Sequence, residues 1–588
     1  MLLPLLLTAL ILTPTTPPPP DWRTPYERDP THTTTATYAE CVAFYERLAA
    51  AYPAHVQMRQ TGVSDGGVPL HAVVVSTDGA ATPEAARTRN LRVVLVQNGI
   101  HPGEPEGIDA SMMLVRDLAQ QPAARRVLRS LTLVVVPCYN VDGMLARGPH
   151  SRVNQAGPAE YGFRGNARNL DLNRDYVKQD SRNARAFAEL FQAWRPDVFV
   201  ETHTSNGADY QYTMTLIATQ PDKLPPALRT YQTQRLLPAL YERMDRRGWP
   251  MVPYVDFNGR TPESGIIGFL DGPRYSTGYA ALFNTLGFMP ETHMLKPFRA
   301  RVESTRALLD EVLAFVAQDG AALAEARAAA DRQTAAQTEF PLTWTLDEQT
   351  PTETIRFRGY EARTTPSAVS GLPRLSYDRS APFARPVPYF NTYRPGPAVR
   401  RPAAYLIPQA WDEVAERLHR NGVALKRLTK DVALTVEARY IDEFTNPAQP
   451  YEGHFLHRAV KLRTVPDQPR AFRAGDYVAF CNQPAARYLL ETLEPDAPDS
   501  FFAWGFFDSI LQQKEYFSDY VFEDVAAELL RRDPALRQEL QARQAADPAF
   551  AQDAAAQLEW VYRRSPHYEP THRRYPVVRW WGGALPVD

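Results

Sequence analysis

The chain has 588 residues, of which 44% are hydrophobic, so it is long enough to form two or three domains with buried cores. Its formal net charge at pH 7 is -2 and no run of basic residues stands out, which argues against a nucleic-acid partner. The three cysteines, Cys41, Cys138 and Cys481, lie far apart and predict neither a disulfide framework nor a cysteine-based metal site.

The first twenty residues have the pattern of an export signal. Residues 2–12, LLPLLLTALIL, form an apolar run that is too short to cross a bilayer, and TPTTPPPP follows it. No lysine or arginine precedes the run, so an uncleaved anchor and a wrongly assigned start of the chain are the alternatives. We expect residues 1–20 to be a signal peptide, and the mature protein to be secreted or periplasmic without a stable membrane span.

Residues 35–52 are predicted to be helical. The segment after them contains a motif that is either a serine-hydrolase nucleophile site or a hairpin turn. Gly62 to Gly66, GVSDG, matches the G-x-S-x-G pattern of serine hydrolases, which requires a strand before it and a helix after it. Residues 68–76 instead alternate and are β-branched, which predicts a second strand and a hairpin turn at Asp65-Gly66-Gly67. The context therefore argues against a serine nucleophile.

The stretch LRVVLVQNGIHPGEPEGI, residues 91–108, predicts a buried strand, a turn and the start of a helix. His101 and Glu104 lie in the turn, at the edge of the sheet where α/β proteins place their chemistry. An imidazole nitrogen and a carboxylate oxygen three positions apart can bind one ion, and this donor pair suits zinc. Because His-x-x-Glu is common by chance, an ordinary solvated turn is the alternative.

Residues 131–137 predict a second buried strand, and a long loop rich in Gly, Asn and Arg covers residues 148–175. Long loops in compact domains are usually functional, and guanidinium groups pair bidentately with carboxylates. The loop is therefore either a solvated basic segment or a clamp for an anionic substrate group. Its candidate residues are Arg152, Arg164, Arg168, Asn173 and Arg174.

Two further strands end in residues suited to a metal site. A helix at 181–194 precedes a strand at 197–202, and His203 follows as a third donor. After a helix at 227–247 and a segment rich in Gly and aromatics, a strand at 286–290 ends in Glu291. Burial would raise the pKa of this carboxyl toward the range of a general base, although Glu291 could instead pair with Lys296 or a nearby arginine.

The character of the chain changes near residue 340. A long Ala-rich helix at 297–337 is followed by β-structure and loops to about residue 401, then by mixed helices and strands. We expect a catalytic domain at 21–338 and an additional C-terminal α+β region at 339–588. No motif for chemistry is visible after residue 300.

Four motifs together resemble the zinc carboxypeptidase family of the carboxypeptidase A type. They are His101-Pro-Gly-Glu104, Asn173-Arg174 within NLDLNRD, His203 within ETHTSNG and Glu291 within MPETH. They occur in the family's order and at its approximate spacing, and the resemblance covers about residues 35–320. It implies an α/β fold with a mixed central sheet flanked by helices.

The resemblance also implies roles for individual residues. His101, Glu104 and His203 would hold one Zn²⁺, Asn173 and Arg174 would bind the terminal carboxylate of the substrate, and Glu291 would be the general base. The oxyanion-stabilising arginine lies upstream of the Asn-Arg pair, where Arg152, Arg164 and Arg168 compete; spacing favours Arg152, and an insertion would favour Arg164. The active-site tyrosine is expected at Tyr275 rather than Tyr279. Asp175 departs from the family pattern and would place a negative charge near the carboxylate pocket.

The sequence therefore predicts an exported zinc-dependent peptidase that hydrolyses peptide bonds at or near the C-terminus of a peptide substrate. A zinc amidohydrolase or a cell-wall peptide hydrolase using the same site is the first alternative. A non-catalytic peptide-binding protein is the second, and it predicts a broken ligand set or a missing base.

Overall fold

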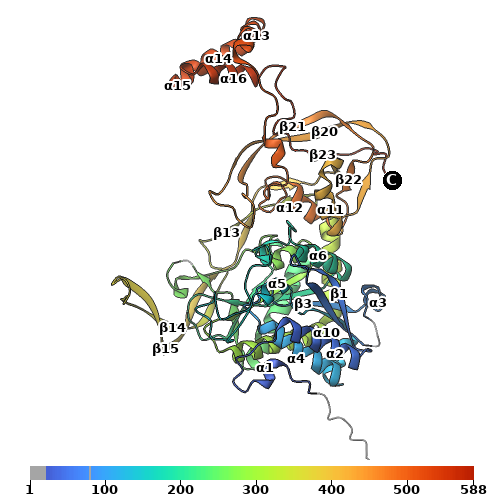
Figure 1. Cartoon of the computed structure of the whole chain (residues 1–588), viewed down its shortest axis with the longest axis vertical. Coiled ribbons are helices and arrows are strands. Elements are labelled where there is room, and N and C mark those ends of the chain that lie inside the picture. Colours follow the sequence, from blue (N-terminus) through green and yellow to red (C-terminus); the bar gives the residue numbers. More distant parts are fainter. Residues whose placement is uncertain (1–20, 78–80, 258) are drawn as a thin grey trace, which may run out of the picture.

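The computed structural model describes residues 21–77, 81–257 and 259–588. The expected signal peptide, residues 1–20, lies outside the described residues. Within the described ranges, no helix has both the length and the hydrophobicity that crossing a bilayer requires. Figure 1 shows a large body formed by the first part of the chain, a second β-rich body above it and a helical group at the far end.

The large body is built on a mixed sheet, as the sequence predicted. Its strands follow the order β1-β2-β4-β3-β5-β11-β7-β8, and β6 pairs with β11 beyond the end of β5. The central strands β3, β4, β5 and β11 are parallel, and antiparallel pairs begin at β2 and at β7. The bounds are β1 Val56–Val63, β2 Pro69–Val75, β3 Arg92–Gln97, β4 Leu131–Val136, β5 Val198–Glu201, β6 His203–Ser205, β7 Met214–Ala218, β8 Met251–Pro253 and β11 Leu286–His293.

Both faces of this sheet are covered, which explains why its central strands are apolar throughout. Along β3, Val94 and Val96 pack into one core while Val93 and Leu95 pack into another, because successive side chains of a strand point to opposite faces. The first core contains helices α2 (Tyr38–Ala51), α4 (Glu106–Gln120) and α10 (Phe298–Ala336). The second contains α6 (Arg182–Trp194) and side chains from the C-terminal region.

The Ser64 segment is a hairpin turn, as the alternation predicted. It connects β1 to the antiparallel β2, and Ser64 donates its hydroxyl hydrogen bond to Asp142. No helix follows Ser64 directly, so this serine has neither the backbone nor the partners of a nucleophile elbow.

Strand β11 is longer than expected, and this changes the place of Glu291. The predicted strand ended at residue 290, whereas β11 continues to His293 because it is paired on both sides there. Glu291 is aligned with His203 of β6 on one side and with Thr215 of β7 on the other. The expectation that Glu291 closes the strand is therefore wrong, and the residue lies inside the sheet next to His203.

The second body contains a six-stranded sheet of order β19-β22-β18-β23-β20-β21. Helix α12 covers it on the side of the large body, since α12 side chains belong to the second core. Its elements are β18 Ala404–Ile407, α11 Asp412–Arg420, β19 Leu425–Arg427, β20 Val432–Thr445, β21 Arg458–Phe472, β22 Tyr477–Phe480, α12 Ala486–Leu493 and β23 Val578–Trp580. The helical group of Figure 1 consists of α13 Asp519–Arg532, α14 Pro534–Ala546, α15 Pro548–Ala551 and α16 Ala554–Tyr562.

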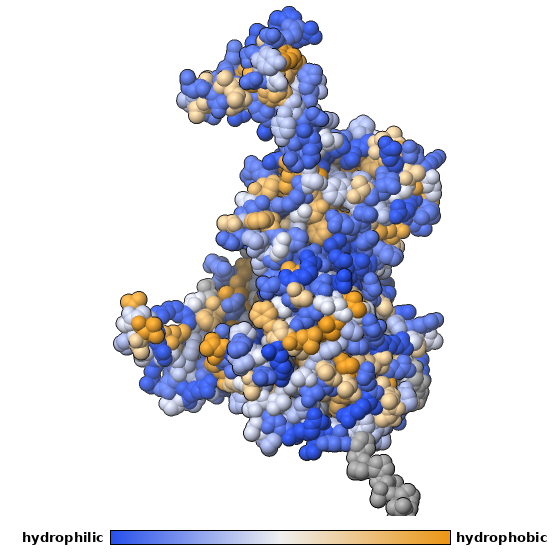
Figure 2. Space-filling model, in the orientation of Figure 1, coloured by the Kyte–Doolittle hydropathy of each residue, from blue (hydrophilic) through white to orange (hydrophobic). Residues whose placement is uncertain are grey.

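A long hairpin of β14 (Glu353–Pro366) and β15 (Pro373–Phe390) extends from the large body (Figure 1). Its base is attached there, because β15 pairs with β10 (Ile266–Ile267). Its tip carries exposed apolar residues, including Val369, which Figure 2 shows as an apolar end on a largely hydrophilic surface. The domain boundary expected at residue 338 lies two residues beyond the end of α10 and stays a prediction, since strands on its two sides pair with each other.

Candidate metal centre

Three side chains that can bind a metal ion converge at the carboxyl ends of β3 and β5. His101 follows β3, Glu104 lies just before α4, and His203 begins β6 directly after β5. One ligand atom from each lies within 4.8 Å of the others, and all three residues are buried. The sequence placed these donors on separate segments, and the fold brings them together.

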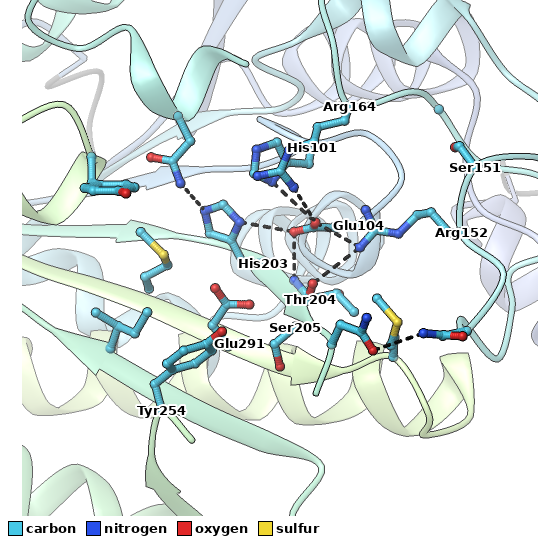
Figure 3. A pocket seen from close by; sticks show the side chains of 18 of the residues that line it. His101, Glu104, Ser151, Arg152, Arg164, His203, Thr204, Ser205, Tyr254 and Glu291 are labelled. Atoms are coloured by element: carbon cyan, nitrogen blue, oxygen red, sulfur yellow. Dashed lines mark hydrogen bonds and ion pairs between the residues drawn. The ribbon is translucent and has the colours of Figure 1, made fainter. Parts of the chain in front are cut away.

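The two imidazoles present the same ring atom to Glu104. His203 Nδ1 lies 3.1 Å from Glu104 Oε2, and His101 Nδ1 lies 3.3 Å from Glu104 Oε1 (Figure 3). The Nδ1 atom of His101 is buried and makes no hydrogen bond with any described residue. A buried nitrogen without a partner is costly, so this atom is suited to a ligand such as a metal ion.

A second carboxylate holds the far side of each imidazole. His101 Nε2 lies 2.9 Å from Asp171 Oδ1, and His203 Nε2 lies 2.9 Å from Glu201 Oε2. Each Nε2–H donates to its carboxylate, which leaves the Nδ1 lone pair directed at the centre. Metal-binding histidines usually have such partners, because the partner fixes the tautomer and makes the imidazole a stronger ligand.

The charges around the centre favour a cation. Burial opposes the ionisation of Glu104, but Arg152 and the imidazoles hold its pKa well below the usual range. Burial likewise opposes the charged form of His203, but Glu201 and Glu104 raise its pKa well above the usual value. Two nitrogen donors and one carboxylate oxygen, buried and backed by carboxylates, fit Zn²⁺.

Glu291 lies beside this cluster, with its carboxylate on the His203 side (Figure 3). It is only 9% exposed, and burial, together with the nearby charge of Glu104, raises its pKa to about 8. The alternative partner Lys296 is occupied elsewhere, by the backbone carbonyl of Tyr210 and by Asp209. The alternative pairing of Glu291 with Lys296 is therefore not formed, and the role of Glu291 as a base stays a prediction.

Two of the three competing arginines reach the centre. Arg152 Nη2 lies 2.9 Å from Glu104 Oε1, and its Nε donates to Gln155. Arg164 contacts Asp171 at 2.9 Å and has Nη1 3.7 Å from Glu104 Oε1. Arg168 instead donates to the backbone carbonyl of Asp180 and does not line the pocket.

Asn173, Arg174 and Tyr275 lie together on another wall of the same pocket. The guanidinium of Arg174 lies over the ring of Tyr275, 4.6 Å from its centroid, and Arg174 Nη1 donates to the carbonyl of Asn173. Tyr279 is fully buried, donates to Asn421 and does not line the pocket, and the role of Tyr275 stays a prediction.

Asp175 does not place its charge in the pocket, contrary to the expectation. It is fully buried beneath the loop, where its Oδ1 lies 2.8 Å from Lys178 Nζ. Its other oxygen accepts hydrogen bonds from the backbone and the hydroxyl of Ser181. Lys178 neutralises this carboxylate. Asp175, which departs from the family pattern, therefore stabilises the loop and the start of α6.

Sequence reasoning missed several residues of the site. Asp171 and Glu201 hold the imidazoles and lie two positions from Asn173 and from His203, so a search for carboxylates near each motif would have found them. Tyr254 also lines the pocket, and its segment offered no periodic signal. The pocket has a volume of about 610 Å³, and its apolar lining includes Ile217, Phe269 and Met289.

Comparisons with known proteins agree with this geometry. Residues 41–216 match the family model described as zinc carboxypeptidase. Carboxypeptidase 2 of Trichophyton tonsurans is 26% identical over 441 residues, which cover 72% of this chain and 75% of that protein. Carboxypeptidase 2 of Trichophyton rubrum is 25% identical over 446 residues, which cover 72% of this chain and 76% of that protein.

Solved structures of carboxypeptidases also match part of the chain. The metallo-carboxypeptidase of Burkholderia cenocepacia has a TM-score of 0.36 and 18% identity, covering 48% of this chain and 69% of that chain. Carboxypeptidase A of Helicoverpa armigera has a TM-score of 0.36 and 13% identity, covering 51% of this chain and 75% of that chain.

The family match of residues 41–216 and the buried His101-Glu104-His203 triad define the class: this part of the chain is of the zinc carboxypeptidase family. It is a metallocarboxypeptidase with one zinc site formed by this triad, and its substrates are peptides. The alternative of a non-catalytic binding protein predicted a broken ligand set, and the intact triad contradicts it.

Proposed function

We propose that this metallocarboxypeptidase releases residues one at a time from the free C-terminus of a peptide, with Glu291 as general base and Arg174 as the binding group for the terminal carboxylate. One observation carries the proposal. A single pocket is lined by the three metal donors, by Glu291 and by Arg174, so the scissile bond and the terminal carboxylate can be held at the same time.

The chain's own residues supply the proton transfers. When bound, zinc would lower the pKa of water and polarise the scissile carbonyl. Glu291 accepts a proton from the attacking water and passes it to the nitrogen of the leaving amine as the C–N bond breaks. A buried carboxylate with a raised pKa is a stronger base than an exposed one, which suits it to this task.

Arg174 supports exopeptidase action because one nitrogen of its guanidinium, Nη2, is available. Its Nε and Nη1 have protein partners, whereas Nη2 makes no hydrogen bond to any residue that the structure describes. Arg164 is the better candidate for stabilising the oxyanion, because its charge acts on Glu291 and its Nη1 reaches the centre. Arg152 is more fully engaged, by Glu104, Gln155 and the carbonyl of Thr204.

The proposal is tested by replacing Glu291→Gln, which preserves size and removes the base. We expect bound zinc to remain at the wild-type level while kcat falls by about 10²–10⁴-fold, the usual contribution of a general base. Glu303→Gln on the exposed face of α10 is the matched control, because Glu303 pairs with Arg299 on the surface. Near-normal turnover in Glu291→Gln would exclude Glu291 as the base.

The substrate class is tested with a mixture of peptides and mass analysis of the products. Loss of single C-terminal residues supports the proposal. Internal cuts, or release of acyl groups from amidated peptides, would support the zinc amidohydrolase or cell-wall peptide hydrolase alternative. Equal cleavage of peptides with a free and an amidated C-terminus would exclude carboxylate binding by Arg174.

We also propose that the enzyme is exported, on the basis of the apolar run at residues 2–12 and the proline-rich segment after it. Expression of the full chain followed by cell fractionation and N-terminal sequencing tests this. A mature N-terminus near residue 21 outside the cytoplasm is expected, and an intact Met1 in the cytoplasm would contradict it.

A further inference from the structure

The C-terminal region inserts one tight hairpin turn against the active-site loop. β20 and β21 are joined by residues 446–457, and within this segment the backbones of Tyr451 and His454 exchange two hydrogen bonds around Glu452 and Gly453. Both turn residues have positive φ, 51° and 82°. Such two-residue turns favour Asn-Gly or Asp-Gly, so a glutamate there is conformationally costly and points to a special role.

Two adjacent residues of this turn contact residues of the site. The hydroxyl of Tyr451 accepts a hydrogen bond of 2.9 Å from Arg174 Nε. Glu452 Oε2 accepts a hydrogen bond of 2.8 Å from the backbone N–H of Asp171. Asp171 is also the carboxylate that accepts from His101. The hydrogen bond from Asp171 N–H to Glu452 therefore offsets the conformational cost of a glutamate with positive φ, and it does so beside the metal site.

The contact with Arg174 fixes the direction of its guanidinium. Tyr451 takes Nε, the carbonyl of Asn173 takes Nη1, and the ring of Tyr275 covers one face. With Nε and Nη1 each donating to a fixed acceptor, Nη2 is the nitrogen left to bind another group. It is the group that a substrate carboxylate would contact.

Tyr451 is itself held rigidly by the C-terminal region. Its ring stacks on that of Trp504 with a centroid separation of 6.1 Å and an interplanar angle of 19°. Arg274 lies 5.0 Å from the Trp504 ring and is paired with Asp499 at 2.7 Å. This packing places the hydroxyl of Tyr451 against Arg174 Nε, as orienting that side chain requires.

We propose that Tyr451 is a positioning residue for Arg174, and that the C-terminal region thereby completes the pocket for the substrate's terminal carboxylate. The inference rests on the proposed role of Arg174. Tyr451 does not line the pocket and acts only through Arg174. Its effect is expected on the binding of the free C-terminus and not on the chemical step.

The test uses the full-length, zinc-loaded enzyme and the variant Tyr451→Phe, which removes one oxygen and keeps the ring on Trp504. Two peptides are compared that differ only in having a free or an amidated C-terminus. For the free acid we expect KM to rise about 10-fold, the usual effect of losing a hydrogen bond to a charged group, with kcat changed less than about twofold. For the amide we expect no change in kcat/KM beyond about twofold.

A double-mutant cycle separates positioning from a general structural effect. In an Arg174→Ala background, Tyr451→Phe should have no further effect on KM, because the group it orients is gone. Tyr440→Phe is the matched control: it also removes a hydroxyl from the C-terminal sheet, but that hydroxyl donates to Pro570 at the surface. It should leave both substrates unaffected.

The outcomes distinguish the two proposals. If Arg174→Ala leaves the preference for the free acid intact, the proposed role of Arg174 fails. If Arg174→Ala abolishes the preference but Tyr451→Phe leaves KM unchanged, affects both peptides equally or adds fully to Arg174→Ala, only the inference about Tyr451 is overturned.

Discussion

The strands of the N-terminal and C-terminal halves of the chain differ in how deeply they are buried. In the N-terminal half, β3, β4, β5 and β11 are almost entirely buried, and polar side chains appear at or near their carboxyl ends. In the C-terminal half, the long strands β14, β15, β20 and β21 alternate between exposed and partly buried residues. The first half carries the metal donors and the proposed base, and the second contacts the loop that lies beside them.

This difference in burial determines which functional residues can be recognised from the sequence alone. A buried strand that ends in a histidine or a carboxylate stands out from its apolar context, because burying such a group requires a partner. A tyrosine in a surface hairpin does not stand out. If the comparison is right, substitutions in the first half should affect metal and chemistry, and those in the second should affect binding or only local stability.

The largest effect is expected for His203→Ala, which removes one of three metal donors. We expect bound zinc to fall well below one ion per chain and hydrolysis to be lost, because the remaining pair forms an incomplete site. Metal analysis of purified protein after dialysis is the measurement. A variant that keeps a full zinc content would show that His203 is not a ligand.

A smaller effect is expected for Glu201→Gln, which acts one step further from the metal. The carboxylate accepts from His203 Nε2 at 2.9 Å, and losing such a partner typically lowers metal affinity about 10–100-fold. Competition with a chelator measures this affinity. Glu437→Gln, which weakens a carboxylate–arginine pair in the C-terminal sheet, should leave zinc affinity unchanged, and an equal loss in both variants would contradict the comparison.

The stability of the fold should fall in acid through His293, at the junction of the two halves. Its ring is fully buried, and its Nε2–H donates to the carbonyl of Ala208 while its Nδ1 accepts from Leu295 N–H. Burial lowers its pKa from 6.5 to about 4. The neutral form is therefore favoured in the folded state, and protonation costs stability.

The lowered pKa of His293 determines the pH range over which it contributes to stability. The contribution of His293 is complete above pH 6.5, the ordinary value, and is lost as the pH falls toward about 4, with a total of about 3 kcal/mol. Urea unfolding at several pH values, compared with His293→Gln, measures it. The variant should show a weaker loss of stability over this range, and an identical pH dependence would contradict the assignment.

The smallest effect is expected at the tip of the β14–β15 hairpin. Val369 is 98% exposed, so Val369→Ser should change the free energy of unfolding by no more than about 0.5 kcal/mol. Val387 in β15 is fully buried against the large body, and Val387→Ala should cost about 1–3 kcal/mol. Denaturant unfolding compares the two valines, and a large effect at Val369 would mean that the tip has a partner.

Much of the N-terminal fold and the metal donors could be predicted, because hydrophobic runs locate buried strands and the motifs stand at their ends. The extension of β11 could not, since it depends on pairing with β6 and β7 at once. Nor could the choice between Arg152 and Arg164, because both reach Glu104 from one irregular loop.

The C-terminal contribution was missed for a physical reason. Tyr451 and Arg174 are 277 positions apart, and their contact depends on how two bodies pack. No motif for chemistry is visible after residue 300, and neither motif nor periodicity marks Tyr451 and Glu452, although both contact residues of the site.

Because Arg174 and Tyr451 are far apart in the sequence, they are synthesised at different times. A ribosome has synthesised all three zinc donors by residue 203, but the turn at Tyr451 comes much later, and its strand β20 is flanked in the sheet by β23, Val578–Trp580. A nascent or truncated chain can thus possess the metal donors while Arg174 still lacks its fixed neighbour. The neighbour that fixes Arg174 is therefore supplied by a segment synthesised long after the metal donors.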